Sequence, residues 1–146
     1  MTRACLPHLK RAANPHVLTL SPPLNFNSMW FGRSLAHSIA KYGMSMATLG
    51  FAVEFRPYGV AANSLWPRTT IATAAIRHVL GGEDAMRNSR DPRIVASAAY
   101  AILTRPSREC TGRFFIDDEV LAEEGITDLS VYGGVENELQ TDIFLD

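Results

Sequence analysis

The stretch HVLTLSPP, residues 16–23, decides the fold because an apolar run ends at two prolines. This pattern predicts a buried strand that leads into a loop over residues 22–33. Residues 34–55 then follow without an internal proline and are rich in Ala, Met and Leu. They predict a helix of about twenty residues with Ser34 as its N-cap. A second apolar run at 60–66 predicts another strand, so the chain alternates strand, helix and strand.

The flanking sequence extends this alternation. Gly81 and Gly82 would close a helix, and the pair Asp91-Pro92 would begin the next one, in the usual cap-and-proline arrangement. Continuous apolar strands separated by helices indicate an α/β protein with a mainly parallel sheet covered on both faces. The flanking elements are expected as helices at 2–12, 69–80 and 91–104 and as a third strand at 112–116.

The composition suits one globular domain over residues 1–146, with a core at about 1–118 and an irregular acidic tail at 119–146. Fourteen basic side chains oppose fifteen acidic ones, so no nucleic-acid partner is expected. The two cysteines, Cys5 and Cys110, lie outside any metal-ligand spacing, and we expect no metal and a reducing, cytoplasmic location. The longest apolar stretch, 96–103, is too short to span a membrane, and no membrane partner is expected.

Four blocks occur in a fixed order along the chain: SPPLN at 21–25, AHSIAKYGMSM at 36–46, NSLWP at 63–67 with Thr73, and TGRFFID at 111–117. Together they resemble the short-chain dehydrogenase/reductase family. The likeness is closest to its hydroxysteroid-dehydrogenase-like subgroup, and it covers nearly the whole chain but only the C-terminal part of a complete family domain. It implies a partial Rossmann-type, doubly wound parallel sheet that lacks its N-terminal strands.

The resemblance also implies a catalytic site. The family uses a Tyr-x-x-x-Lys segment, in which the tyrosine exchanges a proton with the substrate oxygen. Here His37 stands in place of the tyrosine, Lys41 keeps the lysine position, and Ser21 keeps the place of the serine that hydrogen-bonds the substrate oxygen. The cofactor would be NAD or NADP. Its expected contacts are Lys41, Pro67, Thr70, Ile71 and Thr73.

His37 leaves two interpretations open. An imidazole can act as a general acid, and on a helix His37 and Lys41 share one face. The ring is shorter than a phenol, however, so its proton would sit away from the position that Ser21 and Lys41 define. His37 is either a substitute proton donor or a replacement without a catalytic role.

Two functions therefore remain open. The first is NAD(P)-dependent interconversion of a small-molecule alcohol and carbonyl. No glycine-rich phosphate-binding turn precedes the site, so we expect a truncated domain with little or no activity alone. The second is a non-catalytic remnant that serves as a subunit-association module. In the family the long helix forms the dimer interface, so a homo-oligomer through residues 34–55 is expected.

Overall fold

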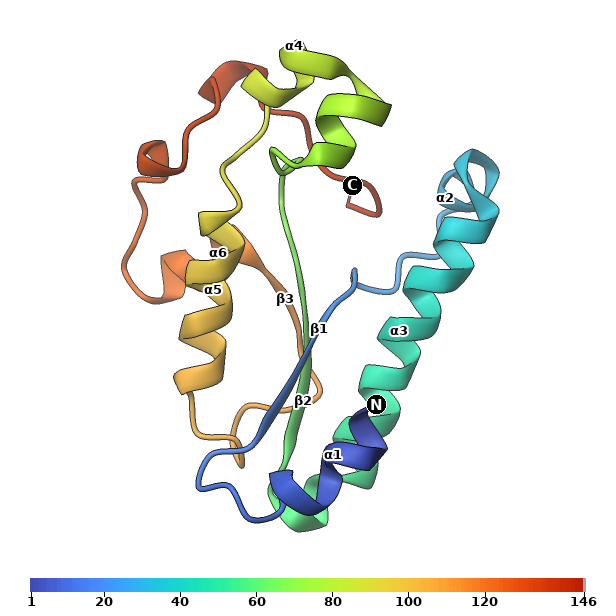
Figure 1. Cartoon of the computed structure of the whole chain (residues 1–146), viewed down its shortest axis with the longest axis vertical. Coiled ribbons are helices and arrows are strands. Elements are labelled where there is room, and N and C mark those ends of the chain that lie inside the picture. The colour runs from blue at the N-terminus through green and yellow to red at the C-terminus, as the bar shows by residue number, and fades with distance from the viewer. Residues whose placement is uncertain (146) are drawn as a thin grey trace. The chain divides into compact units, whose positions relative to one another are not determined.

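The computed structural model describes residues 1–145, which form two compact units (Figure 1). The first unit comprises Met1–Trp66 and Ile102–Phe115. The second unit comprises Pro67–Ala101 and the described residues from Ile116 onward. The elements that these units contain are α1 (Thr2–Leu9), β1 (His16–Leu20), α2 (Ser28–Arg33), α3 (Leu35–Glu54), β2 (Ala61–Trp66), a π-helical segment (Ile76–Leu80), α4 (Gly82–Arg87), α5 (Arg93–Thr104), β3 (Phe114–Ile116), α6 (Asp117–Glu123) and short 3₁₀ turns at Arg56–Tyr58, Ser130–Tyr132 and Glu136–Glu138.

The sheet confirms the predicted α/β class. Its strands lie in the order β1-β2-β3, and β1 pairs in parallel with β2, from His16 opposite Ala61 to Leu20 opposite Leu65. Every residue of β2 is buried, as expected for the central strand of a parallel sheet. The helix α3 packs against β2 and β1, so that the strand ends and α3 are held together.

The strand β1 is less buried than the sequence predicts. Four of its residues are half-buried, and Leu20 is 51% exposed. The strand has a neighbour on one side only within the described sheet, so its other edge lacks the cover that β2 receives.

The long helix is confirmed, but the expected capping interaction is not. Ser34 occupies the N-cap position, yet its side chain makes no capping hydrogen bond. Its carbonyl oxygen instead accepts the N–H of Ser38 at 3.0 Å. The sequence therefore predicted the start of the helix correctly. It did not predict that Ser34 takes part there through its carbonyl oxygen and not through its side chain.

A row of hydroxyl groups on α3 holds the segment that follows β1. The hydroxyl of Ser38 donates to the carbonyl of Trp30 at 2.7 Å, and that of Ser45 donates to the carbonyl of Pro22 at 2.7 Å. Between them, the Tyr42 hydroxyl donates to the carbonyl of Asn25. These three side chains are buried at helical spacing, and we call them the hydroxyl seam.

The segment held by the seam was predicted as a loop throughout, which is wrong for its second half. Residues Ser28–Arg33 form α2, and the side chain of Asn27 caps this helix by accepting the N–H of Met29 at 3.2 Å. An asparagine N-cap after two prolines is a local signal for a helix start that the loop prediction overlooked.

In the second unit, the first half of the helix predicted at 69–80 is extended instead. Thr69 forms an antiparallel bridge with Thr141, and Ile71 forms a parallel bridge with Arg90. These partners are distant in the sequence, and local propensity cannot reveal them. Gly82 begins α4 rather than closing the preceding helix.

Two further boundaries concern acidic residues. The Asp91 carboxylate accepts the N–H of Arg93 at 2.8 Å, which confirms the predicted start of α5. The tail expected to be irregular from 119 onward begins with α6, whose first turn carries Asp117, Asp118 and Glu119. Negative side chains stabilise the positive end of a helix dipole, which accounts for this unpredicted helix. The last residue of the tail, Asp146, lies outside the described residues.

Candidate functional site

The carboxyl ends of β1 and β2 lie at the same edge of the sheet. Leu20 pairs with Leu65 in the parallel ladder, so Ser21 and Trp66 each follow a paired residue at that edge. In open parallel sheets ligands bind outside the carboxyl ends of the strands. This edge is the candidate site in the first unit.

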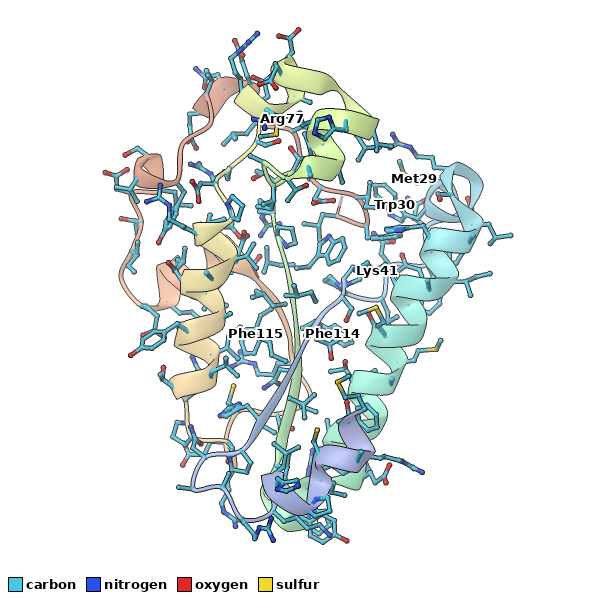
Figure 2. All side chains as sticks on the ribbon, viewed as in Figure 1. Met29, Trp30, Lys41, Arg77, Phe114 and Phe115 are labelled. Carbon is cyan, nitrogen blue, oxygen red and sulfur yellow. The ribbon has the colours of Figure 1, made fainter. Side chains whose placement is uncertain are left out.

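Lys41 reaches this edge from α3. Its Nζ donates a hydrogen bond to the carbonyl oxygen of Leu20 at 3.1 Å, and it lies 5.0 Å from the centre of the Trp66 ring. Lys41 is labelled in Figure 2. An ammonium group has three N–H donors. The bond to Leu20 uses one of them, and the ammonium is thereby fixed beside Ser21.

Ser21 is fully buried, and its Oγ has no hydrogen-bond partner within the described part of the chain. A buried hydroxyl without a partner costs about 1–3 kcal/mol. Such groups are uncommon, and they occur where a ligand atom or an ordered water completes the hydrogen bonding. Ser21 therefore offers both a donor and an acceptor at the end of β1.

His37 lies one helical turn before Lys41 and is exposed. The two side chains share a face of α3, as the spacing predicts. The next residue after Lys41, Tyr42, is buried and engaged in the hydroxyl seam. Tyr42 therefore does not take over the position of a proton donor at the strand edge.

The four residues expected around the nicotinamide belong to the second unit, where Thr70 is heavily engaged. Its N–H donates to the carbonyl of Gln140 at 2.9 Å, and its hydroxyl pairs with that of Ser89 at 2.8 Å. The backbone of Ile71 bridges to Arg90, and the carbonyl of Thr73 accepts the N–H of Arg77 at 3.0 Å. Pro67, which begins this segment, lacks an N–H donor. The cofactor contacts of these residues stay predictions.

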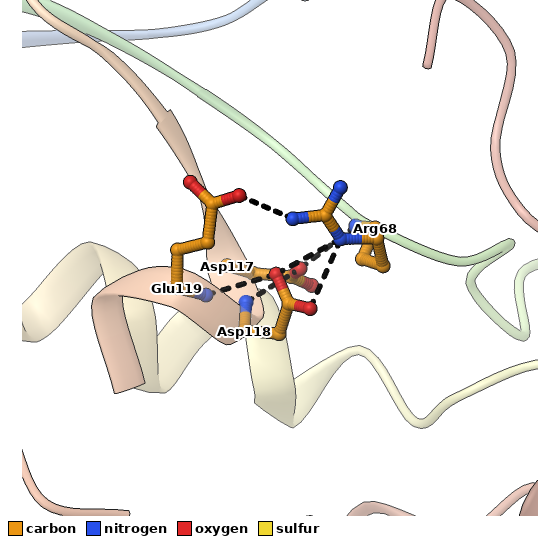
Figure 3. A network of polar contacts seen from close by, with 4 residues as sticks. All are labelled: Arg68, Asp117, Asp118 and Glu119. Carbon is orange, nitrogen blue, oxygen red and sulfur yellow. Dashed lines mark hydrogen bonds and ion pairs between the residues drawn. The ribbon is translucent and has the colours of Figure 1, made fainter. Parts of the chain in front are cut away.

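A polar cluster surrounds Asp117 in the second unit, and it was not predicted from the sequence (Figure 3). The Oδ1 of Asp117 accepts the N–H of Arg68 at 2.8 Å and that of Asp118 at 2.8 Å. The Arg68 guanidinium in turn pairs with Asp118 at 3.0 Å and with Glu119. The signal in the sequence was three consecutive acids directly after the apolar strand 114–116.

The second carboxylate oxygen of Asp117 is left without a partner among the described residues. Asp117 is fully buried, and its Oδ2 accepts no hydrogen bond there. Burial raises the pKa of Asp117 to about 6, against the lowering effect of the N–H groups of Arg68 and Asp118. This carboxyl group therefore exchanges its proton at a pH well above that of an ordinary aspartate.

Two absences concern the described residues as a whole. They contain no group of three or more His, Cys, Asp or Glu side chains arranged to hold a metal ion. No helix among them has the length and apolar character needed to cross a membrane.

Two solved structures are similar to this chain in both fold and sequence. No protein-family model matches the chain. A putative dehydrogenase from Xanthomonas campestris superposes with a TM-score of 0.92 at 51% identity, covering 99% of this chain and 53% of that one. A short-chain dehydrogenase from Mycobacterium thermoresistibile gives a TM-score of 0.88 at 47% identity, covering 99% and 51%. The resemblance to the short-chain dehydrogenase/reductase family and the Rossmann-type fold are thereby confirmed.

The curated relatives narrow this likeness to the predicted subgroup. Hydroxysteroid dehydrogenase-like protein 2 from Danio rerio is 50% identical over 147 residues, and that from Homo sapiens is 47% identical over 146 residues. Each alignment covers 99% of this chain but 34% of the relative. The chain is thus similar to hydroxysteroid dehydrogenase-like proteins and spans about a third of their length.

Proposed function

We propose that this chain carries the acid–base part of an NAD(P)-dependent oxidoreductase that interconverts alcohol and carbonyl groups of a small molecule. The observation that carries the proposal is the placement of Lys41 beside Ser21. The ammonium is fixed on the carbonyl of Leu20, and the adjacent Ser21 hydroxyl is buried without a partner in the described chain. Similarity to dehydrogenases over nearly the whole chain supports the same class.

The residues at this edge fit one end of a nicotinamide cofactor. Lys41 retains N–H donors that suit ribose hydroxyls, and Ser21 can hydrogen-bond a substrate oxygen. When bound, the cofactor would supply or accept the hydride. The sequence contains no G-x-G-x-x-G segment of the kind that forms a pyrophosphate cradle ahead of this site. We therefore propose weak or absent turnover for the chain alone.

The protein groups have separate tasks in this proposal. Reduction of a carbonyl requires a proton on its oxygen, and oxidation of the alcohol requires its removal. Ser21 orients that oxygen through its hydroxyl, while Lys41 holds the ribose and contributes positive charge. His37 occupies the position that passes the proton in the family, and its imidazole is the donor that experiments must test.

The chain has only two lysines, Lys10 and Lys41, which permits a direct test of cofactor binding. An amine-reactive acetylating reagent would be applied with and without NADH or NADPH, and modification of each lysine would be followed by mass spectrometry. We expect the cofactor to slow modification of Lys41 and to leave Lys10, which lies over the Tyr58 ring, unchanged. Equal rates at Lys41 with and without either cofactor would contradict the proposal.

A second candidate function is association through α3, which an exposed apolar row supports. Ile39, Met46 and Val53 are exposed and recur every seven residues. Gly43 and Gly50 lie between them with open space around their α-carbons, which permits close approach of another helix. We propose that a second copy of the chain packs on this row and forms a homo-oligomer.

The association proposal can be tested separately from catalysis. Met46→Lys places a charge in the middle of the row and should reduce the oligomer fraction measured by sedimentation velocity. Val79→Lys adds the same charge at an exposed apolar position of the second unit and serves as the control. A wild-type chain that sediments as a monomer at all concentrations would refute this role.

A further inference from the structure

A pocket of about 210 Å³ lies in the first unit, next to the start of β2. Six-residue β2 separates this pocket from the candidate site, because Val60 lines the pocket and Trp66 stands at the opposite end of the strand. A strand rises about 3.3 Å per residue, which puts roughly 20 Å between the two places. The pocket is lined by Arg56, Gly59, Val60, Ser107, Arg108 and Thr111.

The charge of this pocket is entirely positive. Arg56 and Arg108 supply two guanidinium groups, and no carboxylate is among the lining residues. Within the described chain neither guanidinium forms an ion pair or a side-chain hydrogen bond, whereas Arg3 and Arg68 are each paired with acids. Two uncompensated cations at one pocket attract an anion, even though the whole chain carries a net charge of −1.

The position of Arg108 depends on Gly59. The backbone of Gly59 has φ +71°, and an added Cβ would lie 2.7 Å from Cζ of Arg108. The guanidinium thus packs directly on the glycine backbone, in space that any side chain would occupy. The buried Ser107 hydroxyl donates to the Gly59 carbonyl at 2.8 Å and holds the two segments of the pocket together.

Thr111 adds a neutral hydrogen-bond donor. Its Oγ1 accepts the N–H of Ala62 at 3.1 Å, so its hydroxyl proton remains available to another acceptor. Two guanidinium groups and a hydroxyl form a donor set for an oxyanion. Arginine matches the oxygens of a phosphate group through paired N–H bonds, more closely than a lysine point charge would.

We propose that this pocket binds a small anion of the phosphate-monoester class through Arg56, Arg108 and Thr111. Its volume corresponds to roughly seven water molecules, enough for one phosphate group and part of its substituent. The site is distinct from the edge that carries Ser21 and Lys41, and it does not depend on the oxidoreductase proposal. The phosphate can belong to a free metabolite or to a lipid headgroup.

The test measures binding of inorganic phosphate to the 146-residue chain by isothermal titration calorimetry, with chloride at matched ionic strength as the reference. Arg56→Gln and Arg108→Gln each remove one guanidinium, and Arg33→Gln removes the same charge from α2, outside the pocket. We expect each pocket variant to weaken phosphate binding at least tenfold and Arg33→Gln to leave it unchanged. Melting temperatures without phosphate should agree among the variants, because both pocket arginines are exposed.

Two results would overturn the proposal. One is a wild-type chain that shows no heat of binding with phosphate beyond that with chloride, and the other is a pocket variant that binds phosphate as the wild type does. A parallel arm identifies the source of the phosphate group. Binding of glycerol phosphate is compared with binding to phosphatidylcholine vesicles that contain phosphatidic acid. Arg108-dependent binding of glycerol phosphate identifies a free metabolite as the ligand, and Arg108-dependent binding to the vesicles identifies a lipid headgroup.

Discussion

The ammonium of Lys41 donates a hydrogen bond to the carbonyl oxygen of Leu20 at 3.1 Å, which ties the middle of α3 to the last residue of β1. The lysine is therefore oriented by the protein itself, before any ligand arrives. A side chain positioned in advance does not lose that freedom on binding, so less of the interaction energy is spent on ordering it.

The first prediction concerns this bond. Lys41→Met keeps an unbranched apolar stem but removes the donor, and it should lower the free energy of unfolding by about 1 kcal/mol, a few degrees in melting temperature. Thermal melts followed by circular dichroism measure the change. Arg33→Met, at an exposed position of α2, is the control, and a Lys41→Met melt equal to that of the control would argue against the bond.

The second prediction separates the two serines at the start of α3. Ser38→Ala removes the partner of the Trp30 carbonyl and should cost about 1–3 kcal/mol of stability. Ser34→Ala should cost less than about 0.5 kcal/mol, because the Ser34 side chain makes no capping bond. Urea unfolding of both variants gives the comparison. A larger loss of stability for Ser34→Ala than for Ser38→Ala would contradict this prediction.

The third prediction follows from the burial of Asp117. Its pKa is raised from 3.8 to about 6, so between these values the folded chain binds more protons at this group than the unfolded chain does. The stabilising contribution of the protonated carboxyl is full below the lower value and is lost as pH rises through the higher one. Asp117→Asn removes this contribution and keeps an oxygen for the N–H groups of Arg68 and Asp118.

Urea unfolding from about pH 4 to about pH 7 measures this effect. The free energy of unfolding of the wild type should fall with pH relative to that of Asp117→Asn. The variant Glu138→Gln, at an exposed acid of the same unit, should run parallel to the wild type. Parallel curves for the wild type and Asp117→Asn would show that this carboxyl titrates normally.

The fourth prediction addresses the unusual residue of the candidate site. His37→Tyr restores the phenol of the family pattern next to Lys41, yet it should not create appreciable turnover in this chain. The sequence contains no G-x-G-x-x-G turn to hold the pyrophosphate, so we expect the cofactor to bind through the Lys41 end alone, too weakly for appreciable turnover. Carbonyl reduction with NADH or NADPH is followed by loss of absorbance, and measurable reduction by the variant would refute the prediction.

Much of the first unit could be predicted because its signals are local. Prolines follow β1 and β2, and the proline-free run of residues 34–55 marks α3. The second unit has one comparable signal, because Asp91 marks the start of α5. The second unit was harder because Thr69 and Ile71 are extended through contacts with Thr141 and Arg90. Long-range pairing of this kind overrides helix propensity and leaves no pattern in the segment itself.

In the candidate site, too, some features could be predicted from local sequence and others depend on the folded structure. The resemblance located Ser21, His37 and Lys41 in the sequence, and the helical spacing placed the last two on one face. That Lys41 is bound to the Leu20 carbonyl depends on how α3 packs against the sheet, which no local spacing encodes. The raised pKa of Asp117 likewise arises from burial, a property of the folded unit as a whole.

The hydroxyl seam of α3 has a consequence for how this scaffold can diversify. The hydroxyl groups of Ser38, Tyr42 and Ser45 donate to main-chain oxygens, at Trp30, Asn25 and Pro22. The ring of Tyr42 also packs against Phe26 and Phe31 of the same segment. A carbonyl oxygen is the same whichever amino acid carries it, so these three hydrogen bonds make no demand on side-chain identity in the segment, in contrast to the ring contacts of Tyr42. Residues beside the strand edge can therefore be exchanged to suit a new small molecule while the path of the backbone is preserved.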